Sequence, residues 1–207
     1  MILVKQVVSW QPQLYWRWLY RRFLADRWQY RIFPQHRWLL GQIKRLRPKS
    51  ILEVGCGFGR NLEFLLKCGV SVSLTGIDIS RPLLKLARRN LAAATKLIHA
   101  NLLSLPFAAN SFDLVFTHGV LMHVKPADLV RALHGLVRVT KRYLILIEEI
   151  RPKPKQLNYF TWAHDYDKII AALPVKILTR KIGKYLLIWY CVKKLSMPTG
   201  ANLTRPS

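Results

Sequence analysis

Three glycines stand at alternate positions in one short stretch of the chain, residues 50–62 (SILEVGCGFGRNL). They are Gly55, Gly57 and Gly59, with strand-compatible residues before them and a helix-like pattern that begins near Asn61. Because glycine has no Cβ, it tolerates positive φ and lets a ligand lie directly against the backbone. The free N–H groups at the start of the following helix favour a carboxylate or a phosphate. The stretch therefore predicts a strand, a tight turn and a helix that together hold a cofactor.

The neighbouring residues narrow the class of cofactor. Asn61 and Leu62 follow the last glycine, so the third glycine of a dinucleotide fingerprint is missing, and no Gly-Lys-Ser/Thr sequence marks a phosphate-binding loop. Asp78 ends the next apolar run, about twenty residues after Gly59, the spacing at which a carboxylate accepts hydrogen bonds from both ribose hydroxyls. A helix cap or a solvated turn is the alternative role for Asp78. The pattern favours a ligand that contains a ribose.

Apolar strands alternate with helical patterns through the middle of the chain. Ser80 is expected to cap a helix that has Pro82 in its first turn, and Pro126 is expected to open another helix. This alternation is typical of βαβ units in a parallel sheet, in which ligands bind at the carboxyl ends of the strands. The expected strands are residues 50–54, 70–79, 95–101, 112–117 and 143–147, and the expected helices include residues 60–68 and 126–139.

Four segments together resemble the class I S-adenosylmethionine-dependent methyltransferases. They are the Glu53-to-Gly59 stretch, Asp78 after its strand, residues 101–107 (NLLSLPF) and residues 111–115 (SFDLV). The resemblance covers about residues 48–150. It implies an α/β fold: a Rossmann-like, seven-stranded, mostly parallel sheet with the last strand reversed, flanked by helices.

The resemblance also implies a binding site for S-adenosylmethionine. In that family the glycine loop lies against the methionine and ribose, and Glu53 would stand behind the amino group. Asp78 would hold the ribose and Ile79 would pack on the adenine. Asn101 stands where many members carry aspartate, but its amide oxygen can still accept a hydrogen bond from the adenine amine. Nine residues are assigned to the cofactor: Glu53, Gly55, Gly57, Gly59, Asp78, Ile79, Asn101, Leu102 and His118.

A narrower resemblance concerns the acceptor. Residues 116–124, 143–149 and 162–165 are similar to methylases of pseudaminic acid and other surface-sugar pathways. This similarity implies a small polar or sugar-like acceptor, although residues 151–155 (RPKPK) are more basic than expected of that group.

Methyl transfer from a sulfonium is an in-line displacement that needs alignment above all, and a base only if the acceptor is a hydroxyl or a protonated amine. Three residues in the expected acceptor region are candidates for that base: His123, Glu149 and His164. The alternative for each is a structural role, such as a histidine at the start of a helix. The Asn-Pro-Pro-Tyr-like motif of methylases that act on nucleic-acid amino groups is absent after the fourth strand, where Thr117-His118-Gly119-Val120 stands. No metal site is expected.

The net charge of +24 is concentrated in the flanks of the chain. Basic residues outnumber acidic ones by 11 to 1 in residues 1–50, by 12 to 7 in residues 51–150 and by 11 to 2 in residues 151–207. Residues 10–47 interleave arginines with aromatic side chains and are expected to form helices over residues 13–30 and 35–46. These helices either cover one edge of the core with arginine stems or dock on an anionic membrane or RNA, as the basic segment 151–155 could also do.

The whole chain, residues 1–207, is expected to form a single domain. Residues 1–47 would be a basic aromatic extension, 48–150 the cofactor core, 151–195 an acceptor-side cap with a helix at 162–173 and closing strands at 175–179 and 185–192, and 196–207 a flexible tail. The three scattered cysteines indicate reduced thiols. Because no apolar run is long enough to span a bilayer or to form a signal peptide, a cytoplasmic location is expected, either in solution or peripheral at the membrane.

The sequence thus predicts an S-adenosylmethionine-dependent methyltransferase that O-methylates a small-molecule, sugar-like or lipid-linked acceptor. An RNA methyltransferase that docks through the basic flanks is the first alternative. A non-catalytic module of the same fold that binds nucleic acid or membrane is the second. The oligomeric state is left open.

Overall fold

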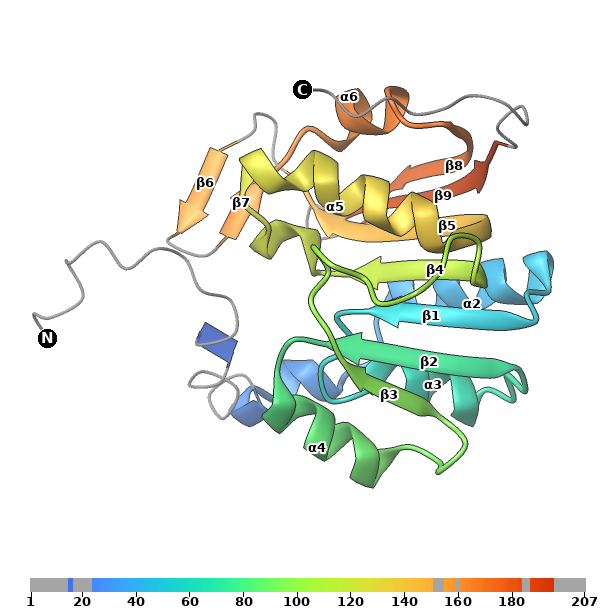
Figure 1. The fold of residues 1–207 in the computed structure, drawn as a ribbon. Helices are drawn as coiled ribbons and strands as arrows, with labels where there is room; N and C mark the ends of the chain where they lie inside the picture. Colours follow the sequence, from blue (N-terminus) through green and yellow to red (C-terminus); the bar gives the residue numbers. More distant parts are fainter. Residues whose placement is uncertain (1–14, 17–23, 151–154, 159–160, 184–186, 196–207) are drawn as a thin grey trace, which may run out of the picture.

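The computed structural model describes residues 15–16, 24–150, 155–158, 161–183 and 187–195, and Figure 1 shows the arrangement of their helices and strands. Half of the predicted helix over residues 13–30, the basic segment 151–154 and the tail from residue 196 lie outside the described residues. No helix within the described ranges has the length and apolar character needed to span a bilayer.

A seven-stranded sheet forms the centre of the molecule, with strand order β3-β2-β1-β4-β5-β9-β8. The last strand, β9, pairs antiparallel with both β5 and β8, whereas the pairs from β3 to β5 are parallel. The predicted sheet with a reversed last strand is therefore confirmed. Its strands are β1 (Ser50–Val54), β2 (Ser73–Asp78), β3 (Lys96–His99), β4 (Phe112–His118), β5 (Thr140–Glu149), β8 (Val175–Ile182) and β9 (Leu187–Lys194).

Helices cover both faces of this sheet. Apolar side chains of α2 (Pro34–Leu46), α3 (Arg60–Lys67) and α4 (Arg81–Asn90) pack on one face, and those of α5 (Pro126–Val139) and α6 (Tyr166–Ala171) pack on the other. The buried strands alternate between the two cores: in β5, for example, Leu144 and Leu146 face one core, and Ile145 and Ile147 face the other. The alternation explains why the central strands read as continuous apolar runs.

The predicted helix boundaries agree closely where capping residues mark them. The side chain of Ser80 accepts a hydrogen bond from the Leu83 backbone N–H at 3.4 Å, and Pro82 lies in the first turn of α4. α5 begins at Pro126 and ends at Val139, as the sequence predicts. These local signals therefore determine where the helices start.

Two helix predictions were wrong in part. The segment predicted as a helix over residues 162–173 begins as a strand, β7 (Thr161–Ala163), which pairs with β6 (Lys155–Asn158). The helix starts only after Asp165, whose carboxylate accepts the Lys168 N–H at 3.1 Å and caps α6. In the described end of the predicted helix 13–30, residues 27–30 form a 3-10 turn, η1 (Arg27–Tyr30), preceded by the non-helical Asp26.

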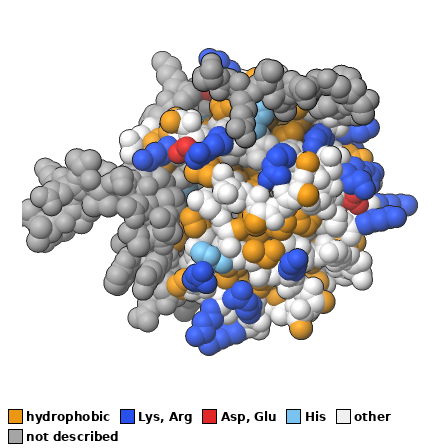
Figure 2. Space-filling view, viewed as in Figure 1, with side chains coloured by type: hydrophobic (Ala, Val, Ile, Leu, Met, Phe, Trp, Pro, Cys, Tyr) orange, Lys and Arg blue, Asp and Glu red, His pale blue; other side chains and the backbone are white. Residues whose placement is uncertain are grey.

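Basic side chains are spread over the outer surface. Figure 2 shows Lys and Arg at several places on the viewed face, with few acidic side chains between them. Helix α4 contributes four exposed ones: Arg81, Lys85, Arg88 and Arg89.

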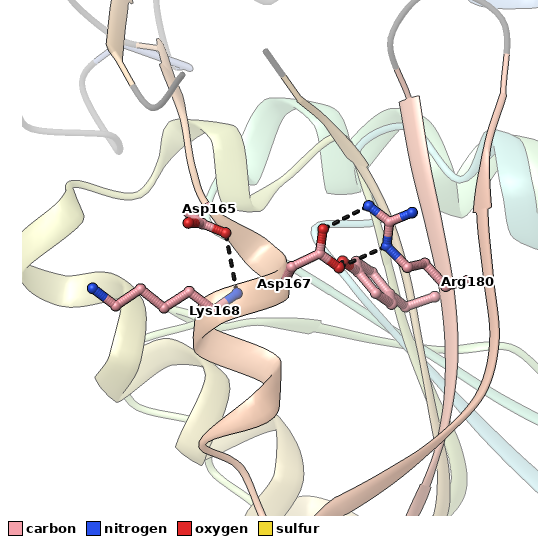
Figure 3. A network of polar contacts seen from close by, with 5 residues as sticks. Asp165, Asp167, Lys168 and Arg180 are labelled. Carbon is pink, nitrogen blue, oxygen red and sulfur yellow. Dashed lines mark hydrogen bonds and ion pairs between the residues drawn. The ribbon is translucent and has the colours of Figure 1, made fainter. Parts of the chain in front are cut away.

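Helix α6 is tied to the far edge of the sheet by one carboxylate, that of Asp167 (Figure 3). The Arg180 guanidinium donates two hydrogen bonds of 2.6 Å to Asp167, and the Tyr190 hydroxyl donates a third. The bonds from Arg180 hold the pKa of Asp167 below its usual range. Because Asp167 and Arg180 are exposed, the pair orients α6 more than it stabilises the fold.

Candidate functional site

A cavity of about 590 Å³ opens at the carboxyl ends of the parallel strands. The loops that follow β1, β2, β3 and β4, the end of β5 and the start of β9 form its walls, and Tyr15, Trp16 and Gln29 contribute from the N-terminal segment. Its volume lies in the range of small-molecule sites. Nine of the twelve predicted site residues line it: Gly55, Gly57, Asp78, Ile79, Asn101, Leu102, His118, His123 and Glu149.

The glycine loop approaches its neighbours closely on one side and leaves space on the other. Gly55 has φ of 77°, and a Cβ at this position would lie 2.4 Å from a methyl carbon of Val120. Gly57 has φ of 55°, and a Cβ there would meet no atom within 4 Å. Gly59, at the start of α3, does not line the cavity and packs against Leu91. The loop can therefore receive a ligand at Gly57, because no side chain fills that space.

Asp78 is fixed at the end of β2 by two backbone donors. Its Oδ1 accepts from Ser80 N at 2.7 Å and its Oδ2 from Gly57 N at 2.8 Å. Burial raises the pKa of Asp78, and the bonds from Ser80 and Gly57 oppose that rise. The carboxylate is thus oriented toward the cavity before any ligand arrives. Next to it, the Ile79 carbonyl lies 3.0 Å from Nε2 of His99, a contact that orients the backbone beside the predicted adenine position.

Asn101 forms a local turn with its own side chain. Its Oδ1 accepts the Leu103 N–H at 2.9 Å, so one of the two lone pairs of the amide oxygen is already used. The second lone pair is left for the predicted bond from an adenine amine. Leu102 lies beside it in the same wall.

Glu53 does not line the cavity but lies buried behind the glycine loop. Its Oε1 accepts a 2.6 Å hydrogen bond from Nδ2 of Asn61, whose Oδ1 lies 3.2 Å from Nδ1 of His118. Because the Asn61 amide donates to Glu53, its oxygen must accept from His118, which places the proton of the neutral imidazole on Nδ1. Burial holds the pKa of His118 well below its usual range. The sequence did not single out Asn61, the residue that links the two predicted ones.

Two further residues beside the Glu53–Asn61–His118 contacts were not predicted from the sequence. The ring of His36, on α2, lies 5.1 Å from that of His118, and its Nδ1 accepts the Phe33 N–H at 3.0 Å. Burial lowers the pKa of His36 to about 4. Arg60, the first residue of α3, lines the cavity. No local motif marks His36, which is brought to the site by the packing of α2 on α3, whereas Arg60 directly follows Gly59 in the glycine stretch.

The three candidate bases lie in different surroundings. His123 and Glu149 line the cavity, and the ring of His123 meets Trp16 edge to face with the ring centres 5.0 Å apart. His164 is not brought to the cavity: it is buried, and its Nε2 lies 3.1 Å from the Leu121 carbonyl. The geometry thus gives His164 a structural position, in which it holds the turn after β4.

Glu148, next to the candidate Glu149, is the polar centre of that turn. Its fully buried carboxylate accepts from Thr117 Oγ1 at 2.7 Å and from the N–H groups of Val120 and Leu121 at 3.0 Å each. These bonds position the segment that carries His118 and His123. Desolvation by burial raises the pKa of Glu148 to about 7, although the hydrogen bonds act in the opposite direction.

The buried carboxyls predict a fall in stability between pH 6.5 and pH 8. Burial raises the pKa of Glu148 to about 7 and that of Glu53 to about 8, so the folded state binds more protons than the unfolded state in this window. The lowered pKa values of His36, His118 and His164 act in the opposite direction, because unfolded histidines are still half protonated at pH 6.5, so the carboxyl contribution is measured by comparing the parent with a variant. We expect the free energy of unfolding in urea to fall by about 1 kcal/mol more across the window in the parent than in Glu148→Gln, which lacks the titrating carboxyl. Glu53→Gln should change the pH dependence less, because only about half of a group with a pKa of about 8 has lost its proton at pH 8. A pH dependence in Glu148→Gln equal to that of the parent would contradict the assignment.

The residues present fit a cofactor that contains a ribose and a charged amino acid. The Asp78 carboxylate lies in the cavity wall, and the space at Gly57 can hold a ligand directly against the backbone. Behind the loop, Oε2 of Glu53 is buried and has no hydrogen-bond partner among the described residues. We expect this carboxyl oxygen to accept a hydrogen bond from the amino group of such a molecule.

Known proteins resemble this chain in both sequence and fold. A family model described as a methyltransferase domain matches residues 51–143. The demethylmenaquinone methyltransferase of Shouchella clausii is 31% identical over 72% of this chain and 64% of its own length. The trans-aconitate 2-methyltransferase of Afipia carboxidovorans is 35% identical over 80% of this chain and 69% of its own length.

Among solved structures, the magnesium protoporphyrin IX methyltransferase of Synechocystis PCC 6803 with bound S-adenosylmethionine has the same fold, with a TM-score of 0.70. It is 15% identical, and the match covers 91% of this chain and 99% of that one. The chain spans slightly less than two thirds of the Shouchella relative and slightly more than two thirds of the Afipia relative. On these similarities and on the sheet order, the chain belongs to the class I S-adenosylmethionine-dependent methyltransferases.

Proposed function

We propose that the protein transfers the methyl group of S-adenosylmethionine to a small-molecule acceptor. The observation that supports this proposal is a cavity whose lining includes both predicted cofactor residues and predicted bases. Asp78 and Gly57 belong to the first group, and His123 and Glu149 belong to the second. One cavity can therefore hold the donor and the acceptor in the alignment that an in-line displacement requires.

The residues of the chain would divide the work as follows. Asp78 accepts hydrogen bonds from the ribose hydroxyls, and Ile79 and Leu102 pack beside the base. Glu148 holds the turn after β4, so His118 and His123 keep their positions. The bound cofactor supplies an electrophilic methyl group on a sulfonium. When the acceptor is a hydroxyl, Glu149 or His123 would take its proton as the methyl group supplied by the cofactor passes to the acceptor oxygen.

For the acceptor, we propose O-methylation of a sugar-like or lipid-linked small molecule. The cavity wall includes apolar side chains, such as Trp16, Met122 and Leu187, as well as the carboxylate of Glu149. Such a wall suits a molecule with an apolar body and a polar reacting group. The names of the two relatives, a demethylmenaquinone and a trans-aconitate methyltransferase, support small acceptors of different polarity.

The excess of basic residues supports one alternative, methylation of RNA. The exposed arginines and lysines of α4 and the basic flanks of the sequence would neutralise phosphates or, equally, the headgroups of an anionic membrane. We propose that the protein acts in the cytoplasm and associates with membranes at their surface when its acceptor is lipid-linked.

Transfer of labelled methyl groups from S-adenosylmethionine into a cell extract would identify the acceptor class. The extract is separated after the reaction into small molecules, lipids and RNA, and the label in each fraction is counted. We expect label in the small-molecule or lipid fraction, and at least a tenfold lower rate with Glu149→Gln if that residue accepts the proton. Label confined to RNA would favour the alternative, and no transfer of label into any fraction would contradict the enzymatic proposal.

A further inference from the structure

Arg60 places a guanidinium in the wall of the cofactor cavity. It is the first residue of α3, one position after Gly59, and its side chain is partly buried. Its Nη1 donates a 3.1 Å hydrogen bond to the Gln29 carbonyl of η1. Tyr30, next to Gln29, packs on Phe58 with ring centres 5.4 Å apart. The arginine is thus held from the N-terminal side as well as by its own helix.

The charge of Arg60 acts on one end of the site. It lowers the pKa values of His36 and His118 and opposes the rise in that of Glu53. Asn61, the next residue of α3, bonds Glu53 and lies against His118, so Arg60 begins this helix on the side of the glycine loop where those two residues lie.

Arg60 gives this end of the cavity a positive charge at neutral pH. Burial lowers the pKa of Arg60, yet an arginine stays protonated in proteins. Glu53 is the acid that acts on it, and burial raises the pKa of Glu53 to about 8, so most of that carboxyl is protonated at pH 7. A partly desolvated cation beside a mostly neutral acid favours an anionic ligand group.

The cofactor has one anionic group, the α-carboxylate of its methionine part. Asp78, Gly57 and Arg60 line the same cavity, so a cofactor with its ribose at Asp78 and its chain across Gly57 would bring its amino-acid end toward Arg60. We propose that Arg60 binds this carboxylate, with its planar guanidinium as a paired donor. The Gln29 carbonyl and η1 position the guanidinium, which gives the N-terminal segment a part in cofactor binding. This inference rests on the cofactor assignment above.

The experiment compares two ligands that differ at the amino-acid end. S-adenosylhomocysteine has the α-carboxylate, whereas 5′-methylthioadenosine has the same nucleoside and thioether without the amino acid. Calorimetric titration of Arg60→Met should show about 30-fold weaker binding of S-adenosylhomocysteine, as expected for a charge-assisted hydrogen bond, and a change of less than about twofold for methylthioadenosine. The affinity of Arg60→Lys for S-adenosylhomocysteine should lie between those of the parent and Arg60→Met, because lysine keeps the charge and loses the paired donors.

Arg81→Met is the matched control. Arg81 is also the first residue of a helix that follows a strand, α4, but it is exposed and does not line the cavity. The affinities of Arg81→Met for both ligands should stay within about twofold of those of the parent. An unchanged affinity of Arg60→Met for S-adenosylhomocysteine, or an equal loss for both ligands, would overturn the inference. If the parent protein binds neither ligand, the cofactor assignment itself fails, which is a separate result.

Discussion

Replacing Asp78 with alanine is expected to weaken binding of S-adenosylhomocysteine at least about 100-fold, because two charge-assisted hydrogen bonds to the ribose, each about 1.5–3 kcal/mol, are lost. The carboxylate is already fixed by the N–H groups of Gly57 and Ser80, so the parent protein spends little free energy on orienting it. Isothermal titration calorimetry gives the affinity directly. Unlike Arg60→Met, this substitution should weaken the binding of methylthioadenosine as strongly as that of S-adenosylhomocysteine, because both ligands carry the ribose.

Asp113 supplies the control for this substitution. It is also buried and accepts a backbone N–H, that of Lys49 at 2.8 Å, but it lies near the amino end of β4, where the ligand does not reach. Asp113→Asn should leave the affinity within about twofold of the parent, and Asp78→Asn should fall between the parent and Asp78→Ala. Parent-like affinity in Asp78→Ala would remove the ribose assignment.

Replacing Glu148 with alanine is expected to lower the free energy of unfolding by at least about 3 kcal/mol, because three buried donors lose their acceptor and each costs about 1–3 kcal/mol. The donors are the Thr117 hydroxyl and the N–H groups of Val120 and Leu121. Urea denaturation at pH 6.5 measures the loss. The turn after β4 should loosen as well, which would reduce cofactor affinity along with stability.

Glu149 provides a neighbouring carboxylate in a different setting. It is half-buried and lines the cavity, so Glu149→Ala should cost less than about 1 kcal/mol of stability while it slows methyl transfer. Glu148→Gln, which keeps one acceptor oxygen, should recover part of the loss in Glu148→Ala. Equal stability of the Glu148→Ala and Glu149→Ala variants would show that the turn does not depend on the buried carboxylate.

The sheet and most helix starts were predictable because their causes are local. Apolar runs such as residues 112–117 identify buried strands, and residues such as Ser80 and Pro126 mark helix starts by side-chain capping and by the fixed φ of proline. The glycines and Asp78 were predictable for the same reason. Their spacing along the chain is set by the strand–turn–helix unit itself.

The rest of the site depends on contacts between distant segments. Asn61 and His118 are 57 positions apart, and His36 reaches the same cluster from a helix that the sequence could place only as cover for the core or as a docking surface. His164 is a suitable residue type for a base and lies in the expected acceptor region of the sequence, but packing turns its ring toward the Leu121 carbonyl. β7 was mistaken for helix because a three-residue strand is too short to show a period.

A crystal structure of the protein with S-adenosylhomocysteine tests the central claim most directly. The account predicts the ligand in the cavity at the carboxyl ends of the strands, with both ribose hydroxyls within about 3 Å of the Asp78 carboxylate and the thioether facing the wall that carries His123 and Glu149. The α-carboxylate should meet Arg60. A ligand bound elsewhere, or one whose ribose makes no contact with Asp78, would contradict the account.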